Sequence, residues 1–311
     1  MVVVGQMVLA PAALGRQIVT LTTDFGLTNE AVGLVHGAVL AIDSDIEVVD
    51  LCHAVDSFDV LLGALTLAGT EIFPAGTVHV AVIDPGVGTP RAPIAVRTRT
   101  GQYYVGPNNG LFTEVIRRQG LDSVVRLEPL RVNPRWAPGT FDGRDLFGPA
   151  GALLAMSSGD LSRVGRSFPP DSLVRLDVPE PTIDVARHTA VGVVLRIDEP
   201  YGNVWTNIGQ KELAAIGIER GSGLEVVITP ASGGDSADRA DRADRADPAD
   251  RAASPVRLRL PLVITFGNVA EGSPLAYIAS AGTLGFAINL GSFRDVYSVA
   301  PGWRVQVEAQ E

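Results

Sequence analysis

The chain has little cysteine and little histidine. Cys52 is the single cysteine among 311 residues, and the histidines are His36, His53, His79 and His188. One cysteine excludes an internal disulfide framework and a thiolate zinc cluster, and the histidines show no paired spacing typical of metal ligands. The sequence therefore predicts no metal site, and a protein of a reducing compartment, the cytoplasm.

Excess basic charge and long apolar runs are also missing. Thirty-five acidic side chains against 25 basic ones give a formal net charge of -10, which disfavours a nucleic-acid partner. No stretch reaches the ~18 uninterrupted apolar residues that would span a membrane. Residues 1–17 lack the basic start and the cleavage site of a signal peptide, so we expect a leader without an assigned role, or a short extra strand. The hydrophobic content of 46% argues against a disordered chain.

Residues 18–168 alternate short apolar runs with segments of helical period. The predicted strands are Ile18–Thr22, Ile46–Leu51, Thr77–Ile83, Pro93–Arg97, Gln102–Val105 and Ser123–Leu127, and the predicted helices are Ala31–Ile42, Phe58–Ile72, Leu111–Arg118 and Asp145–Met156. The strands around Thr100 and Gly101 are expected to form a hairpin. Strands that alternate with helices predict an α/β domain with a largely parallel central sheet.

The pattern changes near residue 169. Prolines mark a linker over residues 169–189, because proline lacks a backbone donor and ends regular elements. In residues 190–311 few helices are expected, and the predicted strands are Ala190–Ile197, Leu224–Thr229, Val256–Leu260, Ala276–Ala279 and Arg304–Glu308. This pattern predicts an all-β domain, a small barrel or a sandwich. Residues 235–254 carry Ala-Asp-Arg triplets, which predict a disordered insert or, alternatively, a partner-binding segment.

Polar side chains follow the predicted parallel strands. Asp24 follows the first strand, His53 and Asp56 follow the second, and a glycine-rich turn from Asp84 to Arg91 follows the third. Ligands of doubly wound sheets bind beyond the carboxyl ends of the strands. The turn is neither a Walker loop nor a dinucleotide fingerprint. A helix cap at Asp24 and a bracing ion pair between Asp84 and Arg91 are structural alternatives, so these residues alone leave the function open.

Five motifs, taken in order, resemble those of one family. They are Leu21-Thr22-Thr23-Asp24-Phe25-Gly26, Val82-Ile83-Asp84-Pro85-Gly86-Val87-Gly88-Thr89, Pro107-Asn108-Asn109-Gly110-Leu111, Thr140-Phe141-Asp142-Gly143-Arg144-Asp145 and Ile197-Asp198-Glu199-Pro200-Tyr201-Gly202-Asn203-Val204-Trp205-Thr206-Asn207. Apart from the leader and the insert, the chain resembles the S-adenosylmethionine (SAM) hydroxide adenosyltransferases, or SAM hydrolases, which are related to the SAM-dependent fluorinase and chlorinase. The resemblance implies an α/β domain, a C-terminal β-barrel and a homotrimer with sites at the subunit interfaces. It also implies SAM as the substrate, without a cofactor.

Residue roles follow from the resemblance by position in the motifs. Asp84 and Arg91 occupy two places of the Asp-Arg-His catalytic set of the hydrolases. Asp142 stands where the hydrolases carry the histidine and the halogenases carry an aromatic residue. The implied substrate-binding residues are Asp24, Phe58, Asn108, Phe141, Asp198, Tyr201, Asn203, Phe266, Ser280 and Leu290.

A carboxylate at the point of attack favours water over a halide. A halide site replaces the water around an anion with neutral donors and apolar walls, whereas Asp84 stands where the halogenases have an uncharged residue. The connection from Arg91 to Tyr103 is also shorter than its counterpart in the halogenases. We therefore expect hydrolysis of SAM to adenosine and L-methionine. The alternatives are a SAM-dependent halogenase that makes a 5′-halo-5′-deoxyadenosine, and a non-catalytic protein that binds SAM or adenosine.

Overall fold

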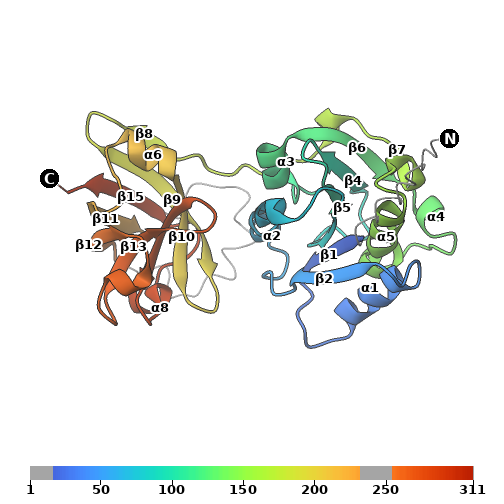
Figure 1. Cartoon of the computed structure of the whole chain (residues 1–311), viewed down its shortest axis with the longest axis horizontal. Coiled ribbons are helices and arrows are strands. Elements are labelled where there is room, and N and C mark those ends of the chain that lie inside the picture. The colour runs from blue at the N-terminus through green and yellow to red at the C-terminus, as the bar shows by residue number, and fades with distance from the viewer. Residues whose placement is uncertain (1–16, 232–253, 311) are drawn as a thin grey trace, which may run out of the picture. The chain divides into compact units, whose positions relative to one another are not determined.

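The computed structural model describes residues 17–231 and 254–310 and divides into two compact units, Met1–Leu176 and Asp177–Glu311 (Figure 1). Residues 1–16 of the predicted leader and residues 235–253 of the predicted insert lie outside the described residues. No helix in the part of the chain that the structure describes combines the length and the apolar character needed to cross a membrane.

The first unit holds a seven-stranded sheet in the order β2-β1-β3-β5-β4-β6-β7. The strands are β1 (Ile18–Thr23), β2 (Glu47–Cys52), β3 (Val78–Val82), β4 (Pro93–Thr98), β5 (Tyr103–Pro107), β6 (Leu121–Leu127) and β7 (Gly165–Ser167). Strands β2, β1, β3 and β5 pair in parallel, and β4, β6 and β7 continue the sheet in antiparallel pairings. Because β6 is antiparallel to β4, the five strands β1, β2, β3, β5 and β6 run in one direction. The predicted largely parallel sheet and the β4–β5 hairpin are confirmed.

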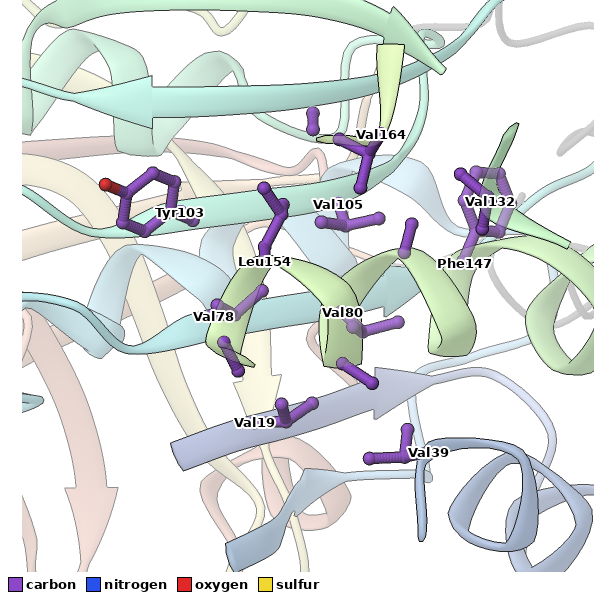
Figure 2. Packing of buried hydrophobic residues seen from close by; sticks show 14 of the residues in the cluster. Val19, Val39, Val78, Val80, Tyr103, Val105, Val132, Phe147, Leu154 and Val164 are labelled. Carbon is purple, nitrogen blue, oxygen red and sulfur yellow. The ribbon is translucent and has the colours of Figure 1, made fainter. Parts of the chain in front are cut away.

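Helices form two apolar cores with the sheet. They are α1 (Ala31–Leu40), α2 (Val60–Leu67), α3 (Thr113–Gln119), α4 (Pro129–Val132) and α5 (Gly148–Met156). One core joins α1 and α5 to the sheet, and Figure 2 shows Leu154 of α5 among Val78, Val80 and Val105. Gly151 lets α5 approach the sheet, because a Cβ there would lie 2.4 Å from Cγ2 of Val80. A separate core joins α2 and α3 to the sheet.

Several predicted elements have different ends in the structure. The helix predicted over Phe58–Ile72 is α2 followed by a 3₁₀ segment, Ala68–Ile72. The helix predicted from Asp145 starts as a π-helical turn, Gly143–Phe147, before α5. Strand β7 was not predicted, because its three residues carry no alternation of apolar and polar side chains. The two helix differences lie at element ends, where the last turn is often not α-helical.

The second unit is a closed barrel, which decides between the two all-β alternatives. Its strands are β8 (Thr182–Asp184), β9 (Thr189–Asp198), β10 (Asn203–Gly209), β11 (Gly223–Thr229), β12 (Val256–Val263), β13 (Pro274–Ile278), β14 (Thr283–Ile288) and β15 (Arg304–Ala309). The order is β10-β14-β13-β12-β11-β15-β9-β8, and the additional pairing of β10 with β9 closes a ring of seven strands. Strand β8 lies inside the segment predicted to be a linker and extends the sheet beside β9. The predicted barrel is confirmed.

Two barrel strands were missed by the sequence reasoning. In β10, Val204, Thr206 and Ile208 are buried, but Thr206 is polar and Trp205 stands between buried positions, so the alternation of apolar and polar residues is broken. Strand β14 contains Gly285, whose missing side chain leaves room for the ring of Tyr277. Glycine lowers strand propensity, which hides a strand that a neighbouring aromatic ring requires. The unit also contains the short helices α6 (Gln210–Ala215) and α8 (Phe293–Tyr297).

Candidate active site

A pocket of about 230 Å³ lies at the carboxyl ends of β1 and β3. It is lined by Asp24 and Phe25 after β1, by Phe58 before α2, by Asp84 after β3 and by residues 140–143. Five of the predicted site residues, including Phe141 and Asp142 of the last segment, therefore line one cavity. A larger hollow of about 780 Å³ beside β6 and β7 is lined by none of them. We place the candidate site in the smaller pocket, because convergent polar groups in a concavity distinguish a binding site better than volume does.

Arg91 joins two carboxylates at this pocket. Its Nε lies 3.1 Å from Oδ1 and 3.0 Å from Oδ2 of Asp84, and its Nη2 donates both to Oδ2 of Asp84 and, over 2.6 Å, to Oδ2 of Asp142. The side chains of Arg91, Asp84 and Asp142 are only 11%, 5% and 12% exposed. The three residues predicted as a catalytic set thus form one network of charge-assisted hydrogen bonds.

The guanidinium in this network is firmly held. Burial alone would lower the pKa of Arg91, but its hydrogen bonds to Asp84 and Asp142 outweigh burial and raise that pKa, so the group stays charged. Its Cζ also lies 5.3 Å from the centre of the Phe147 ring. On the other side of the network, the backbone N–H of Gly86 donates to Oδ1 of Asp84 over 3.2 Å. These contacts fix the orientation of the Asp84 carboxylate.

Asp24 binds the backbone of the loop before α2. Its Oδ2 accepts a hydrogen bond from the N–H of Phe58 over 2.9 Å. The interpretation of Asp24 as a helix cap is wrong, because Glu30 occupies the N-cap position of α1. Phe58 itself has a φ of 68° and is 56% exposed as a whole residue. An unfavourable backbone conformation that presents an apolar ring at a pocket is typical of a ligand-contacting residue.

The segment around Phe141 closes another wall of the pocket. The rings of Phe25 and Phe141 lie 5.7 Å apart in an edge-to-face arrangement, and Cζ of Arg144 lies 5.1 Å from the centre of the Phe141 ring. A Cβ at Gly143 would come within 3.4 Å of both phenylalanine rings, so glycine allows this close packing. The segment continues into the π-helical turn, a rare element found frequently at functional sites.

Asn108 does not line the pocket, and its side chain forms hydrogen bonds elsewhere. Its Nδ2 donates to the carbonyl of Ser172 over 3.0 Å, and its Oδ1 accepts from the N–H of Val174 over 2.9 Å. The side chain therefore binds the segment that follows β7. Its neighbour Asn109 donates to the carbonyl of Ile83 over 2.9 Å and supports the end of β3 directly before the catalytic candidate. The sequence reasoning missed this role, for which the paired asparagines were the available signal.

Three predicted residues of the barrel unit lie where β9 is joined to β10: Asp198 ends β9, Tyr201 is in the turn and Asn203 begins β10. Nδ2 of Asn203 donates to Oδ2 of Asp198 over 3.1 Å, so these two residues do meet. Tyr201 is exposed at the tip of the turn. Ser280 and Leu290 are exposed turn residues elsewhere in the barrel unit, and Leu290 has a φ of 57°.

Phe266 belongs to an aromatic cluster that the sequence reasoning did not single out. Its ring lies 5.1 Å from that of Tyr277, whose hydroxyl accepts a hydrogen bond from Nε1 of Trp205 over 2.8 Å. Cζ of Arg196 lies 4.2 Å from the centre of the Trp205 ring. Burial raises the pKa of Tyr277 to about 12, so its hydroxyl remains protonated near neutral pH. In a chain with 6% aromatic residues, the tryptophan inside a family motif was the signal for this cluster.

Within the described residues, no group of three or more His, Cys, Asp or Glu side chains is arranged to hold a metal ion. The polar groups of the pocket are instead carboxylates joined by a guanidinium. The fold and the pocket together define a class of proteins. Its members have an α/β unit with a polar pocket at the carboxyl edge of the sheet, followed in the chain by a closed barrel.

Comparison with known proteins identifies the family of this chain. The model of the SAM hydroxide adenosyltransferase N-terminal domain matches residues 19–165, and the model of the corresponding C-terminal domain matches residues 192–306. The chain belongs to the SAM hydroxide adenosyltransferase family.

Relatives of two kinds match nearly the whole chain. A (R)-S-adenosyl-L-methionine hydrolase of Salinispora tropica is 35% identical over 94% of this chain and 97% of its own length. A fluorinase of Nocardia brasiliensis is 31% identical, with the same two coverages. The crystal structure of an uncharacterized conserved protein from Thermotoga maritima has a TM-score of 0.79 and 28% identity, covering 94% of this chain and 99% of that one. The family includes proteins named for SAM hydrolysis and for halogenation, so the local chemistry of the site must distinguish them.

Proposed function

We propose that this protein hydrolyses SAM to adenosine and L-methionine. The observation that carries the proposal is the Asp84 carboxylate, which lines the pocket while Arg91 and the N–H of Gly86 fix its orientation. A fixed carboxylate beside a reacting centre is suited to accept a proton from water. The relatives named as hydrolases support the assignment at 33% to 35% identity over most of this chain.

The reaction needs a base but no acid. The oxygen of water forms a bond to C5′ of SAM while the C5′–S bond breaks and its electron pair stays on sulfur. Since the sulfonium leaves as the neutral thioether of methionine, no proton has to be delivered to the leaving group. The proton lost by water passes to Asp84 and then to solvent. Alignment of the water can account for ~7–11 kcal/mol of the barrier in favourable cases, and general base catalysis typically adds ~10²–10⁴-fold.

Arg91 and Asp142 position the base in this proposal. A guanidinium with fixed donors orients the carboxylate, and a second carboxylate on the same guanidinium shares its charge. Arg91 therefore neutralises Asp84 less than it would neutralise a single partner. Substrate binding is assigned to Asp24, Phe58 and Phe141 in the pocket, and to the predicted residues of the barrel unit.

The same charges oppose a halide as the attacking group. Asp84 and Asp142 would repel a chloride or fluoride ion that approached the pocket, and Arg91 already donates to both of them. Water carries no charge and meets no such barrier. We therefore favour the hydrolase over the halogenase, although relatives named fluorinases match the chain at 29% to 31% identity.

The test is product analysis after incubation with SAM. Because the related hydrolases are named for the (R) form, both sulfonium epimers are supplied, each with and without added chloride or fluoride. We expect adenosine and methionine in equal amounts, independent of halide. A halonucleoside would replace the proposal with a halogenase, and SAM that is bound but intact would replace it with a non-catalytic binding protein.

We also propose that the protein acts in the cytoplasm as a homotrimer with sites at the subunit interfaces. The family supports this assembly through the resemblance described above, and the exposed predicted residues Tyr201 and Leu290 are available for contacts between copies. Light scattering after size-exclusion chromatography should give three times the mass of the chain. A monomer that hydrolyses SAM would refute the trimer and leave the reaction intact.

A further inference from the structure

The charged residues that line the pocket are all acidic. Asp24, Asp84 and Asp142 contribute to its wall. Arg91, the group that donates to two of them, is not among the lining residues, and its guanidinium lies near the Phe147 ring. The charged groups on the pocket wall are thus carboxylates.

The charges do not cancel. Three carboxylates and one guanidinium give this group a formal charge of -2 near neutral pH. Arg144, which packs on the Phe141 ring, donates from its Nε to Oδ1 of Asp145 over 2.7 Å, so that these two charges form a pair of their own beside the pocket. The pocket is therefore prepared for a ligand that carries positive charge.

Asp142 supplies a part of this charge that accepts no proton in the proposed reaction. Asp84 is the proposed base and forms an ion pair with Arg91, and Asp24 binds the backbone of Phe58. Asp142 binds a guanidinium that already has a carboxylate partner. A neutral residue at position 142 would leave the Asp84–Arg91 pair in place and lower the formal charge of the group to -1.

We propose that Asp142 is a specificity-determining residue, which makes the pocket select a positively charged centre at the position of the SAM sulfur over a neutral thioether. This inference rests on the proposed function for the identity of the ligand and concerns binding alone. Methyl transfer from SAM converts the sulfonium into the neutral thioether S-adenosyl-L-homocysteine. The two molecules share the nucleoside and the amino acid, so charge at sulfur is the main difference that a pocket can use. An extra carboxylate near the reacting carbon provides that discrimination without contacting the sulfur.

The experiment compares two ligands that cannot undergo the displacement. Sinefungin carries a primary ammonium group at the position of the sulfonium, and S-adenosyl-L-homocysteine carries the neutral sulfur. Isothermal titration gives the ratio of their dissociation constants for the intact protein and for each variant. Asp142→Asn removes the charge with little change in shape, and Asp142→Glu keeps the charge. The matched control is Asp122→Asn, which removes an exposed carboxylate at the start of β6, the end of the sheet away from the pocket.

The intact protein should bind sinefungin more tightly than S-adenosyl-L-homocysteine. Asp142→Asn should reduce this preference about tenfold, the effect of one unit charge acting over several ångströms in a partly buried site. Asp142→Glu should retain most of the preference, and Asp122→Asn should leave it unchanged. If Asp142→Asn does not fold, Asp142→Ser removes the same charge and gives the same test.

Two results would overturn the inference. One is an intact protein without a preference for the cationic ligand, and the other is a neutral variant at position 142 whose preference lies within twofold of the original. Neither result depends on turnover, because no ligand in the titration is consumed. Release of adenosine from SAM is measured separately, so failure of the proposed hydrolysis and failure of the charge selection are distinguishable.

Discussion

Replacement of Asp84 by asparagine tests the proposed base most directly. The new side chain would have nearly the same shape as the old one, and its amide oxygen could still accept hydrogen bonds from Arg91 and from the N–H of Gly86. What the variant loses is the negative charge, the second acceptor oxygen that receives the bond from Nη2 of Arg91, and the capacity to take a proton from water. We therefore expect Asp84→Asn to fold, to bind ligand and to turn over slowly.

The size of both effects follows from the surroundings of Asp84. Loss of a general base lowers kcat by ~10²–10⁴-fold, which is about 3–5 kcal/mol at 1.36 kcal/mol per factor of ten. Removing one partner of a buried ion pair typically costs about 3–5 kcal/mol of stability. Here the cost should be smaller, about 1–2 kcal/mol, because the 2.6 Å bond from Arg91 to Asp142 remains. That loss lies within the ~5–15 kcal/mol stability of a typical domain.

The assay is adenosine release under single-turnover conditions, with a binding titration and a urea unfolding curve on the same preparation. The control is Asp122→Asn, which changes the net charge of the chain by the same amount away from the pocket. A kcat for Asp84→Asn within threefold of the original would refute the assignment of the base. A variant that also fails to bind sinefungin would show instead that Asp84 acts in binding.

Three further predictions concern other parts of the first unit. Arg91→Lys should lower kcat about 10–100-fold with a smaller effect on KM, since a single ammonium cannot reproduce the bonds of a planar guanidinium to two carboxylates. An unchanged kcat in the adenosine assay would contradict the positioning role of Arg91. Burial lowers the pKa of His79 from 6.5 to about 3, so its neutral form stabilises the fold fully above about pH 6.5, and the contribution is lost progressively as pH falls toward 3. Between pH 7 and pH 5, His79 should account for about 2 kcal/mol of lost unfolding free energy in urea titrations, and His79→Gln should show a pH dependence smaller by that amount. Gly106→Ala should lower the free energy of unfolding by about 1–3 kcal/mol, because the new Cβ would lie 2.3 Å from the carbonyl oxygen of Ala81. The control is Gly33→Ala in α1, where a Cβ meets nothing within 4 Å. In thermal melts this control should leave the stability unchanged or raise it.

Most elements of the first unit could be predicted from local pattern, because six of its strands are mainly apolar runs of five to seven residues. The three-residue strand β7 and the four-residue helix α4 were missed, and both are too short to carry a pattern. The barrel was harder. Strand β10 buries the polar Thr206 and leaves Trp205 less buried, and β14 contains a glycine that a neighbouring ring requires. Both strands depend on neighbours far along the chain, for example Val204 of β10, which pairs with Phe286 of β14. Local sequence pattern carries no information about such partners.

For the candidate site too, some positions could be predicted from the sequence and others depend on the tertiary structure. That Asp24 and Asp84 would lie at one edge could be inferred without coordinates. Parallel strands place their carboxyl ends side by side, and the two aspartates stand one and two residues after such strands. The place of Asp142 was expected only from the family resemblance, because the pattern of strands and helices does not supply it. It comes from a segment 51 positions after Arg91, and its contact with the guanidinium depends on how the Phe25 and Phe141 rings pack around Gly143. Spacing along the sequence determines which residues lie close together within one helix or strand. The ion pair between Arg91 and Asp142 joins distant segments, and it forms only after the apolar surfaces of those segments have packed together.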